Sequence, residues 1–79
     1  MAVTIAAVKP KSICFRHGVR AGEMLMQING HEIVDILDYQ FYATERRLTL
    51  TLRSTGGKYR EIRIKKDEYE DLGLTFDTY

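Results

Sequence analysis

The chain has 79 residues, of which 44% are hydrophobic and 29% charged, and its formal net charge is +1. This length allows one domain, and the composition is that of a globular protein and not of a disordered one. The balanced charge argues against a dedicated nucleic-acid-binding protein, and no apolar run approaches the roughly 20 residues of a membrane-spanning helix. With one cysteine, Cys14, and no secretory signal pattern in residues 1–8, we expect a reducing, cytoplasmic location.

The N-terminal part predicts a strand and then a short helix. Residues 3–8 (Val-Thr-Ile-Ala-Ala-Val) are β-prone, and Lys9-Pro10 ends the run. Ser12 is placed to cap a brief helix over residues 13–17, and Gly18 supplies its C-terminal stop.

The next segment predicts a hairpin. Residues 23–28 form a second strand, in which Leu25 has apolar neighbours on both sides, as in a buried central strand. Asn29-Gly30 is the strongest tight-turn signal of the chain, and residues 31–33 would form a short return strand.

The substantial helix is expected from Val34 or Asp35 to about Thr44. Apolar spacing of i, i+3 and i+4 predicts that one side of it faces the core. That side carries Ile33, Ile36, Leu37, Gln40, Phe41 and Ala43.

The C-terminal part predicts three more strands. Residues 48–52 alternate strictly, residues 54–57 form a turn, and residues 59–64 return with Ile62 and Ile64 facing the core. A charged connection over residues 67–70 leads to a last strand, residues 74–76.

Five or six short strands with two helices predict a mainly β, α+β domain. The expected architecture is a small, partly open antiparallel barrel or sandwich. Because strand-like sequence stands at both ends of residues 1–79, we expect a single domain excised from a longer protein.

Three stretches resemble the central signature of PDZ domains. They are Val8-Lys9-Pro10-Lys11-Ser12, Gly18-Val19-Arg20-Ala21-Gly22-Glu23 and Leu25-Met26-Gln27-Ile28-Asn29-Gly30. Lys11 stands where glycine is usual in the family, Ala21 where proline is common and Glu23 where aspartate is common. The family's ligand loop is matched by Leu72-Gly73-Leu74-Thr75-Phe76 alone, which comes last, so the chain resembles the circularly permuted order of bacterial PDZ domains.

The resemblance implies that an extended peptide adds as a strand between residues 72–77 and the helix at residues 34–43. The N–H groups of Leu72, Gly73 and Leu74 would form a nest for the peptide's carboxylate, because Gly73 permits the turn. The strand side of the groove would be Leu72, Leu74, Thr75 and Phe76, and the helix side Val34, Leu37, Asp38 and Phe41. The alternative is that Leu37, Phe41, Leu74 and Phe76 simply fill the core.

Two carboxylates argue against the binding of free peptide C-termini. Glu70 and Asp71 directly precede the loop, and each would repel an incoming carboxylate by about 1 kcal/mol or more near a surface. Lys65 and Lys66 lie further back and would compensate only if the loop folded over. We therefore expect an internal extended segment, or the next domain of the parent protein, as the occupant.

A narrower likeness concerns residues 35–43 together with residues 66–74. This pair is similar to the N-terminal PDZ-like domain of a bacterial family of radical-SAM-like iron–sulfur proteins of poorly defined function. The chain has no Cys-x3-Cys-x2-Cys motif, so the resemblance implies that cluster chemistry would lie outside it and that this domain holds no cofactor. The alternative function is thus an accessory domain that docks in cis on a catalytic part or presents its substrate.

No residue pattern predicts catalysis or metal binding by this domain. Cys14 and His17 share a helical spacing, but Cys14 falls where a small buried residue is expected. His31 reads as a surface turn residue, and the carboxylates of residues 67–71 lack the spacing of a calcium loop. We expect no enzyme activity, no nucleic-acid or membrane partner, and a possible exchange of the last strand between two copies.

Overall fold

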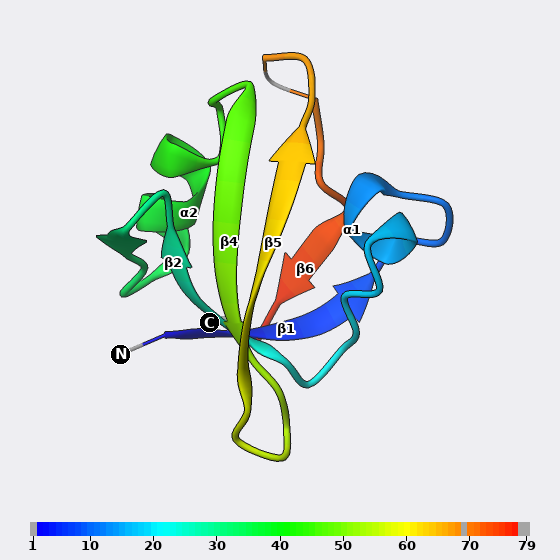
Figure 1. The fold of residues 1–79 in the computed structure, drawn as a ribbon, viewed down its shortest axis with the longest axis vertical. Helices are drawn as coiled ribbons and strands as arrows, with labels where there is room; N and C mark the ends of the chain where they lie inside the picture. The colour runs from blue at the N-terminus through cyan, green and yellow to red at the C-terminus, as the bar shows by residue number, and fades with distance from the viewer. Residues whose placement is uncertain (1, 69, 78–79) are drawn as a thin grey trace.

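The computed structural model describes residues 2–68 and 70–77, so Tyr69 of the predicted charged connection lies outside the described residues. The fold is an antiparallel sheet with two short helices, which confirms the predicted α+β class (Figure 1). The strands and helices are β1 (Val3–Val8), α1 (Ile13–Arg16), β2 (Met24–Ile28), β3 (His31–Glu32), α2 (Ile36–Tyr42), β4 (Arg47–Arg53), β5 (Tyr59–Lys65) and β6 (Leu74–Phe76). Within these described residues, no helix is long and apolar enough to cross a membrane.

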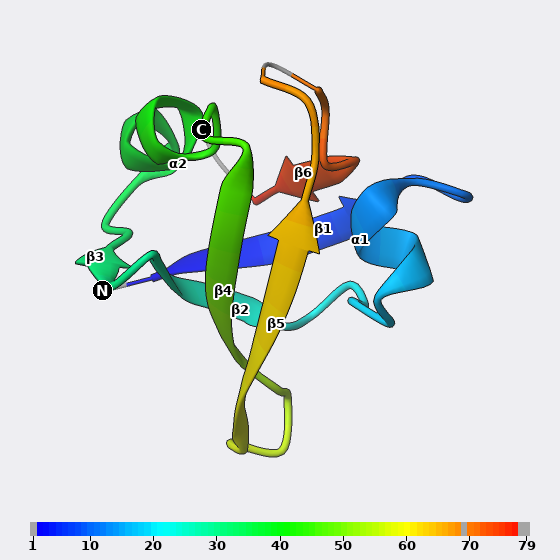
Figure 2. The ribbon, with the colours of Figure 1, turned by 45° about the horizontal axis from the view of Figure 1, so that its top comes forward.

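The sheet is open and strongly bent. Its strand order is β5-β4-β2-β1-β6, with β3 paired to β2, and all pairings are antiparallel. Figures 1 and 2 show the β4–β5 hairpin crossing steeply over β1 and β6. The order makes β5 and β6 the edge strands, so the sheet does not close into a barrel.

The core follows the alternation of the strands. In β4, Leu48, Leu50 and Leu52 are buried, while the residues between them are at least partly exposed, as the strict alternation predicts. Leu25, the predicted central-strand residue, is fully buried, and Ile64 is buried on β5. The other buried apolar side chains of the core are Val3, Ile5, Ile13, Cys14, Val19, Ile28, Ile33, Leu72 and Phe76.

The β2–β3 turn is the tight turn that Asn29-Gly30 predicts. Asn29 and Gly30 both have positive φ, +52° and +81°, which is the conformation of a tight hairpin turn that asparagine and glycine tolerate best. The Asn29 side chain also accepts a hydrogen bond from the Thr49 N–H (2.8 Å) and donates one to the Arg47 carbonyl (3.2 Å). The turn is therefore fixed to β4 as well as to its own hairpin.

Helix α2 begins after Asp35, close to the predicted start, but its buried side differs in part from the prediction. Ile36, Tyr39, Tyr42 and Ala43 pack against the core. The prediction is therefore confirmed for Ile36 and Ala43, and for Ile33 before the helix, but it is wrong for Leu37 and Phe41, which are 69% and 72% exposed. The tyrosine rings cover the core in their place, since a phenol has a large apolar body and a polar tip that reaches solvent.

Candidate functional site

The loop before β6 is held tightly against α1. The Lys9 N–H donates to the Gly73 carbonyl (2.8 Å), and the Cys14 N–H donates to the Leu72 carbonyl (3.2 Å). Gly73 has φ +87°, and a Cβ atom at this position would overlap the Ser12 side chain. Glycine is therefore required here both for the backbone conformation and for the close approach to Ser12.

The chain's own carboxylate already takes one of the three N–H groups of the predicted nest. The Gly73 N–H donates to Oδ1 of Asp71 (3.2 Å), two residues earlier in the chain. Lys66 does not bring a cation to this point, because its Nζ donates to the Asp67 carbonyl (3.2 Å). A free peptide carboxylate would have to displace Asp71 from Gly73 without the help of Lys66.

Strand β6 exposes one backbone edge. The Gly73 carbonyl and the Asp77 N–H both bond to the β1 side, the latter to the Thr4 carbonyl (3.0 Å). Since backbone groups alternate along a strand, those of Leu74 and Phe76 point to the opposite edge. We call this the outer edge of β6; across residues 2–68 and 70–77 the sheet order places no strand on it.

The side chains of β6 link this edge to α2. Phe76 is buried and makes an edge-to-face contact with Tyr39, with ring centroids 4.6 Å apart. Leu74 is half-buried against the core and Thr75 is exposed. For Phe76 the core-filling alternative is thus confirmed, and Tyr39, which was not among the predicted site residues, is the helix side chain in contact with it.

The predicted helix residues of the groove lie elsewhere. Each helical residue turns about 100°, so Leu37 and Phe41 lie about 160° around α2 from Tyr39 and face outward. Val34, which precedes the helix, is 47% exposed. Asp38 caps the helix: its Oδ2 accepts hydrogen bonds from the Val34 N–H (2.9 Å) and the Asp35 N–H (3.4 Å).

The structure therefore brings Leu72, Gly73, Leu74, Thr75 and Phe76 together on one loop and strand beside Tyr39. It leaves Val34, Leu37 and Phe41 on an exposed apolar face of the α2 region. A signal for Tyr39 was present in the sequence, because Ile36, Tyr39 and Ala43 also repeat at i, i+3 and i+7. The spacing of Leu37 and Phe41 indicates a different side of the helix as the buried one. The contact of Tyr39 with Phe76, which the sequence does not reveal, shows which side is buried.

Cys14 has the properties of a core residue and not of a nucleophile. Its side chain is fully buried, and burial, followed by the nearby negative charge of Asp71, raises the pKa of the thiol to about 12. His31 stacks on Tyr42, with ring centroids 4.4 Å apart. In the described part of the chain, no group of three or more His, Cys, Asp or Glu side chains is arranged to hold a metal ion. Comparison of the sequence with protein-family models and with curated proteins gave no match.

Proposed function

We propose that this domain is a non-catalytic protein-interaction module that binds an extended segment as an added strand on the outer edge of β6. The observation that carries the proposal is the backbone edge of Leu74 and Phe76 that faces away from β1, on which no strand of residues 2–68 and 70–77 lies; α2 contacts β6 through Tyr39. An exposed edge strand is a ready template for a partner strand, and a flanking helix adds side-chain contacts. This mode of binding is the one that the resemblance to permuted bacterial PDZ domains implies.

The hydrogen bond between Asp71 and Gly73 supports an internal segment as the ligand in preference to a free C-terminus. Asp71 accepts the Gly73 N–H, whereas the Glu70 carboxylate accepts the Asp67 N–H (3.0 Å). Repulsion by the Asp71 charge would cost an incoming carboxylate about 1 kcal/mol or more, and the Gly73 N–H would first have to be freed. A segment without a terminal charge is not repelled in this way and does not need the Gly73 N–H.

The exposed apolar face of Val34, Leu37 and Phe41 supports a second candidate function. Apolar side chains that gather on a surface often mark a protein–protein contact. This face suits an accessory domain that docks on the catalytic part of a cytoplasmic radical-SAM-like iron–sulfur protein, or presents substrate to it. A Cys-x3-Cys-x2-Cys motif in a longer parent chain would favour this candidate.

The proposal is tested by titrating the isotope-labelled domain with extended peptides that end in either a free carboxylate or an amide. We expect amide shifts at Leu74 and Phe76 and similar affinities for both peptide forms. The informative variant is Leu74→Pro, which removes an outward N–H, and its matched control is Leu74→Ala, which loses the side chain but keeps that donor. Binding should be lost in the proline variant and retained in the alanine variant.

Two outcomes would count against these claims. Shift changes confined to residues away from β6 would contradict strand addition at the outer edge, whether or not the Leu74→Pro variant folds. Micromolar binding that requires the free carboxylate would contradict an internal segment as the ligand.

Asp71→Ala gives a second prediction at the same site. It frees the Gly73 N–H and removes one repelling charge, so affinity for carboxylate peptides should rise about fivefold to tenfold, with little change for amide peptides. The matched control is Glu68→Ala, which removes an exposed charge from the same connection and leaves the Gly73–Asp71 bond intact. Equal gains in both variants would show that overall charge, and not the nest, excludes the carboxylate.

A further inference from the structure

A concave surface lies at α1, on the opposite side of the molecule from α2 (Figure 1). An open cavity of about 550 Å³ is lined by Val8, Phe15, Gly18, Val19, Arg20 and Ala21. Phe15 is 52% exposed although it is a large apolar side chain. The cavity wall is thus mostly apolar, and its charged member is the cation Arg20.

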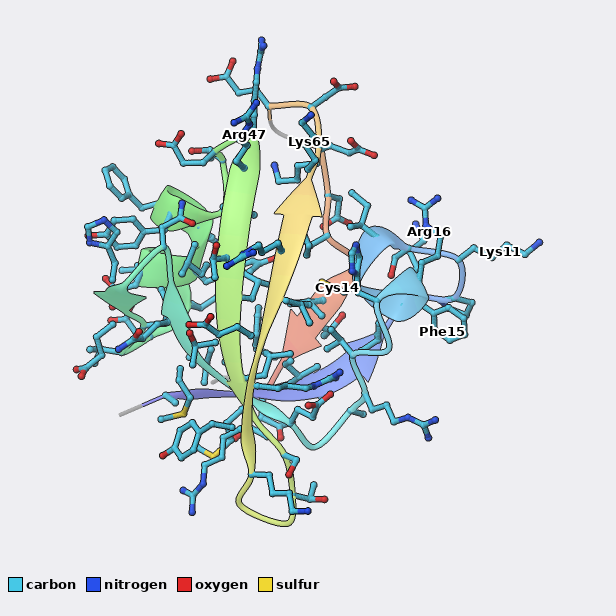
Figure 3. The ribbon with its side chains drawn as sticks, viewed as in Figure 1. Lys11, Cys14, Phe15, Arg16, Arg47 and Lys65 are labelled. Atoms are coloured by element: carbon cyan, nitrogen blue, oxygen red, sulfur yellow. The ribbon has the colours of Figure 1, made fainter. Side chains whose placement is uncertain are left out.

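Arg20 lines this cavity, and two further cations lie at the same end of the molecule. Lys11 and Arg16 extend from the same end of the molecule as Phe15 (Figure 3). Arg20 gives only its backbone N–H to Glu23 (2.8 Å), whose carboxylate is paired with the Arg60 guanidinium at 2.9 Å. Within residues 2–68 and 70–77, the side chains of Lys11, Arg16 and Arg20 form no ion pair, so their positive potential is available to a partner.

Lys11 holds its place at a conformational cost. Its φ is +66°, in the left-handed region, where a residue with a Cβ is less stable than glycine by about 1 kcal/mol or more. Asn29, the other non-glycine residue described with positive φ, sits in a hairpin turn that favours asparagine. Lys11 also lies in a turn: it follows Pro10, and the Ser12 N–H donates to the Lys9 carbonyl (3.1 Å), so it occupies the third position, where a type II turn requires positive φ.

We propose that the α1 face, defined as this cavity with Lys11, Phe15, Arg16 and Arg20, is a second docking surface for an acidic segment of a partner protein. The segment would carry one apolar anchor side chain between its carboxylates. Charge complementarity selects the acidic flanks, and a recess with an apolar wall accepts a protruding side chain. A flat anionic membrane would leave this recess unfilled, which favours the peptide as the occupant.

The test uses two acetylated and amidated nonapeptides. One has a central phenylalanine flanked on each side by four acidic residues, and the other has serine at the centre. Titrated into the isotope-labelled domain, the phenylalanine peptide should shift the amides of Gly18, Val19 and Ala21. It should bind at least fivefold more tightly than the serine peptide, and its affinity should fall as salt is raised.

Variants locate the binding on the α1 face. Phe15→Ala and Arg20→Glu should each weaken the phenylalanine peptide about tenfold. Their matched controls are Tyr59→Ala, another exposed aromatic, and Arg63→Glu, an equal change of charge on the exposed side of β5. Both controls should stay within twofold of the parent domain, and thermal melts should show that all four variants fold.

Three results would overturn the proposal. Equal losses in the control variants would mean non-specific attraction between opposite charges. Shifts at Leu74 and Phe76, with none at residues 18–21, would assign the peptide to the outer edge of β6. Binding to vesicles of phosphatidylcholine and phosphatidylserine, with none to either peptide at millimolar concentration, would assign the α1 face to membranes.

Discussion

At the scale of single residues, two glycines with similar backbone angles have different roles. Gly30 has φ +81° and open space where a Cβ would stand, whereas Gly73 has φ +87° and would place a Cβ on Ser12. Gly30→Ala should therefore cost only the left-handed conformation, about 1 kcal/mol. Gly73→Ala adds a steric clash against α1 and should cost about 3 kcal/mol in total. Urea unfolding of both variants measures the difference.

Gly30→Ala serves as the control for the conformational part of this prediction. Equal losses in the two variants would mean that the loop relaxes away from Ser12 without cost. The close approach of Gly73 to Ser12 would then be unimportant for holding the start of β6. If the losses differ as expected, the loop is rigid, and the outer edge of β6 is fixed before any partner arrives.

At the scale of elements, α2 depends on its N-terminal cap. Oδ1 of Asp35 accepts hydrogen bonds from the N–H groups of Leu37 (3.0 Å) and Asp38 (3.1 Å). A helix of seven residues is marginal by itself, so Asp35→Ala should cost about 1 kcal/mol. Hydrogen exchange should accelerate at the Ala43 amide, which bonds to the Tyr39 carbonyl inside the last turn. Glu68→Ala, outside the cap, should leave this exchange rate unchanged; an equal acceleration would contradict the role of the cap.

Elements also show what could be predicted from the sequence. Strand β4 and the Asn29-Gly30 turn depend on local rules, namely alternation and positive φ, and both were predicted correctly. The orientation of α2 was not, because apolar side chains stand on two of its sides and periodicity cannot choose between them. The contact of Tyr39 with Phe76 joins residues far apart in the chain, and this tertiary packing decides which side is buried.

The candidate site was also predictable only in part from the sequence. The sequence order located the loop and strand over residues 72–76, because Gly73 and the alternation after it are local signals. The sequence also placed Asp71 next to the nest, as a charge that repels a ligand. Its hydrogen bond to the Gly73 N–H depends on the conformation of the loop, which residue types alone do not determine.

At the scale of the whole molecule, the two proposed surfaces are neighbours that use different groups. Val8 lines the α1 cavity and is also paired with Leu74 across the β1–β6 ladder, whereas the outer edge of β6 is the edge that points away from β1. A short ion pair of Glu23 with Arg60 joins the turn before β2 to β5, and the same guanidinium donates to the Gly18 carbonyl (2.9 Å). The wall of the α1 cavity is thus anchored to β5, a strand remote from β6 in the sheet order.

Stability of the whole domain should fall in alkali because two weak acids are buried in its interior. Burial raises the pKa of Cys14 to about 12, and burial followed by the charges of Cys14 and Asp71 raises the pKa of Tyr39 above its usual range. In the unfolded chain the thiol loses its proton near pH 8.5, so above that pH the folded state binds more protons than the unfolded state. The contribution of the protonated Cys14 thiol to the free energy of unfolding is therefore fully present below about pH 8. It is lost as the pH rises towards 12.

Urea unfolding between pH 7 and pH 10 measures this loss, in a range where Cys14 dominates because tyrosine in the unfolded chain titrates near pH 10. The slope should approach about 1 kcal/mol per pH unit above pH 9, since one thiol is involved. Cys14→Ala removes that thiol and is expected to lower stability at pH 7 by leaving a small cavity, but to flatten the curve between pH 8 and pH 10. An equally steep curve in Cys14→Ala would assign the alkaline loss to other groups, and a flat curve in the parent domain would mean that the thiol is not buried as the structure has it.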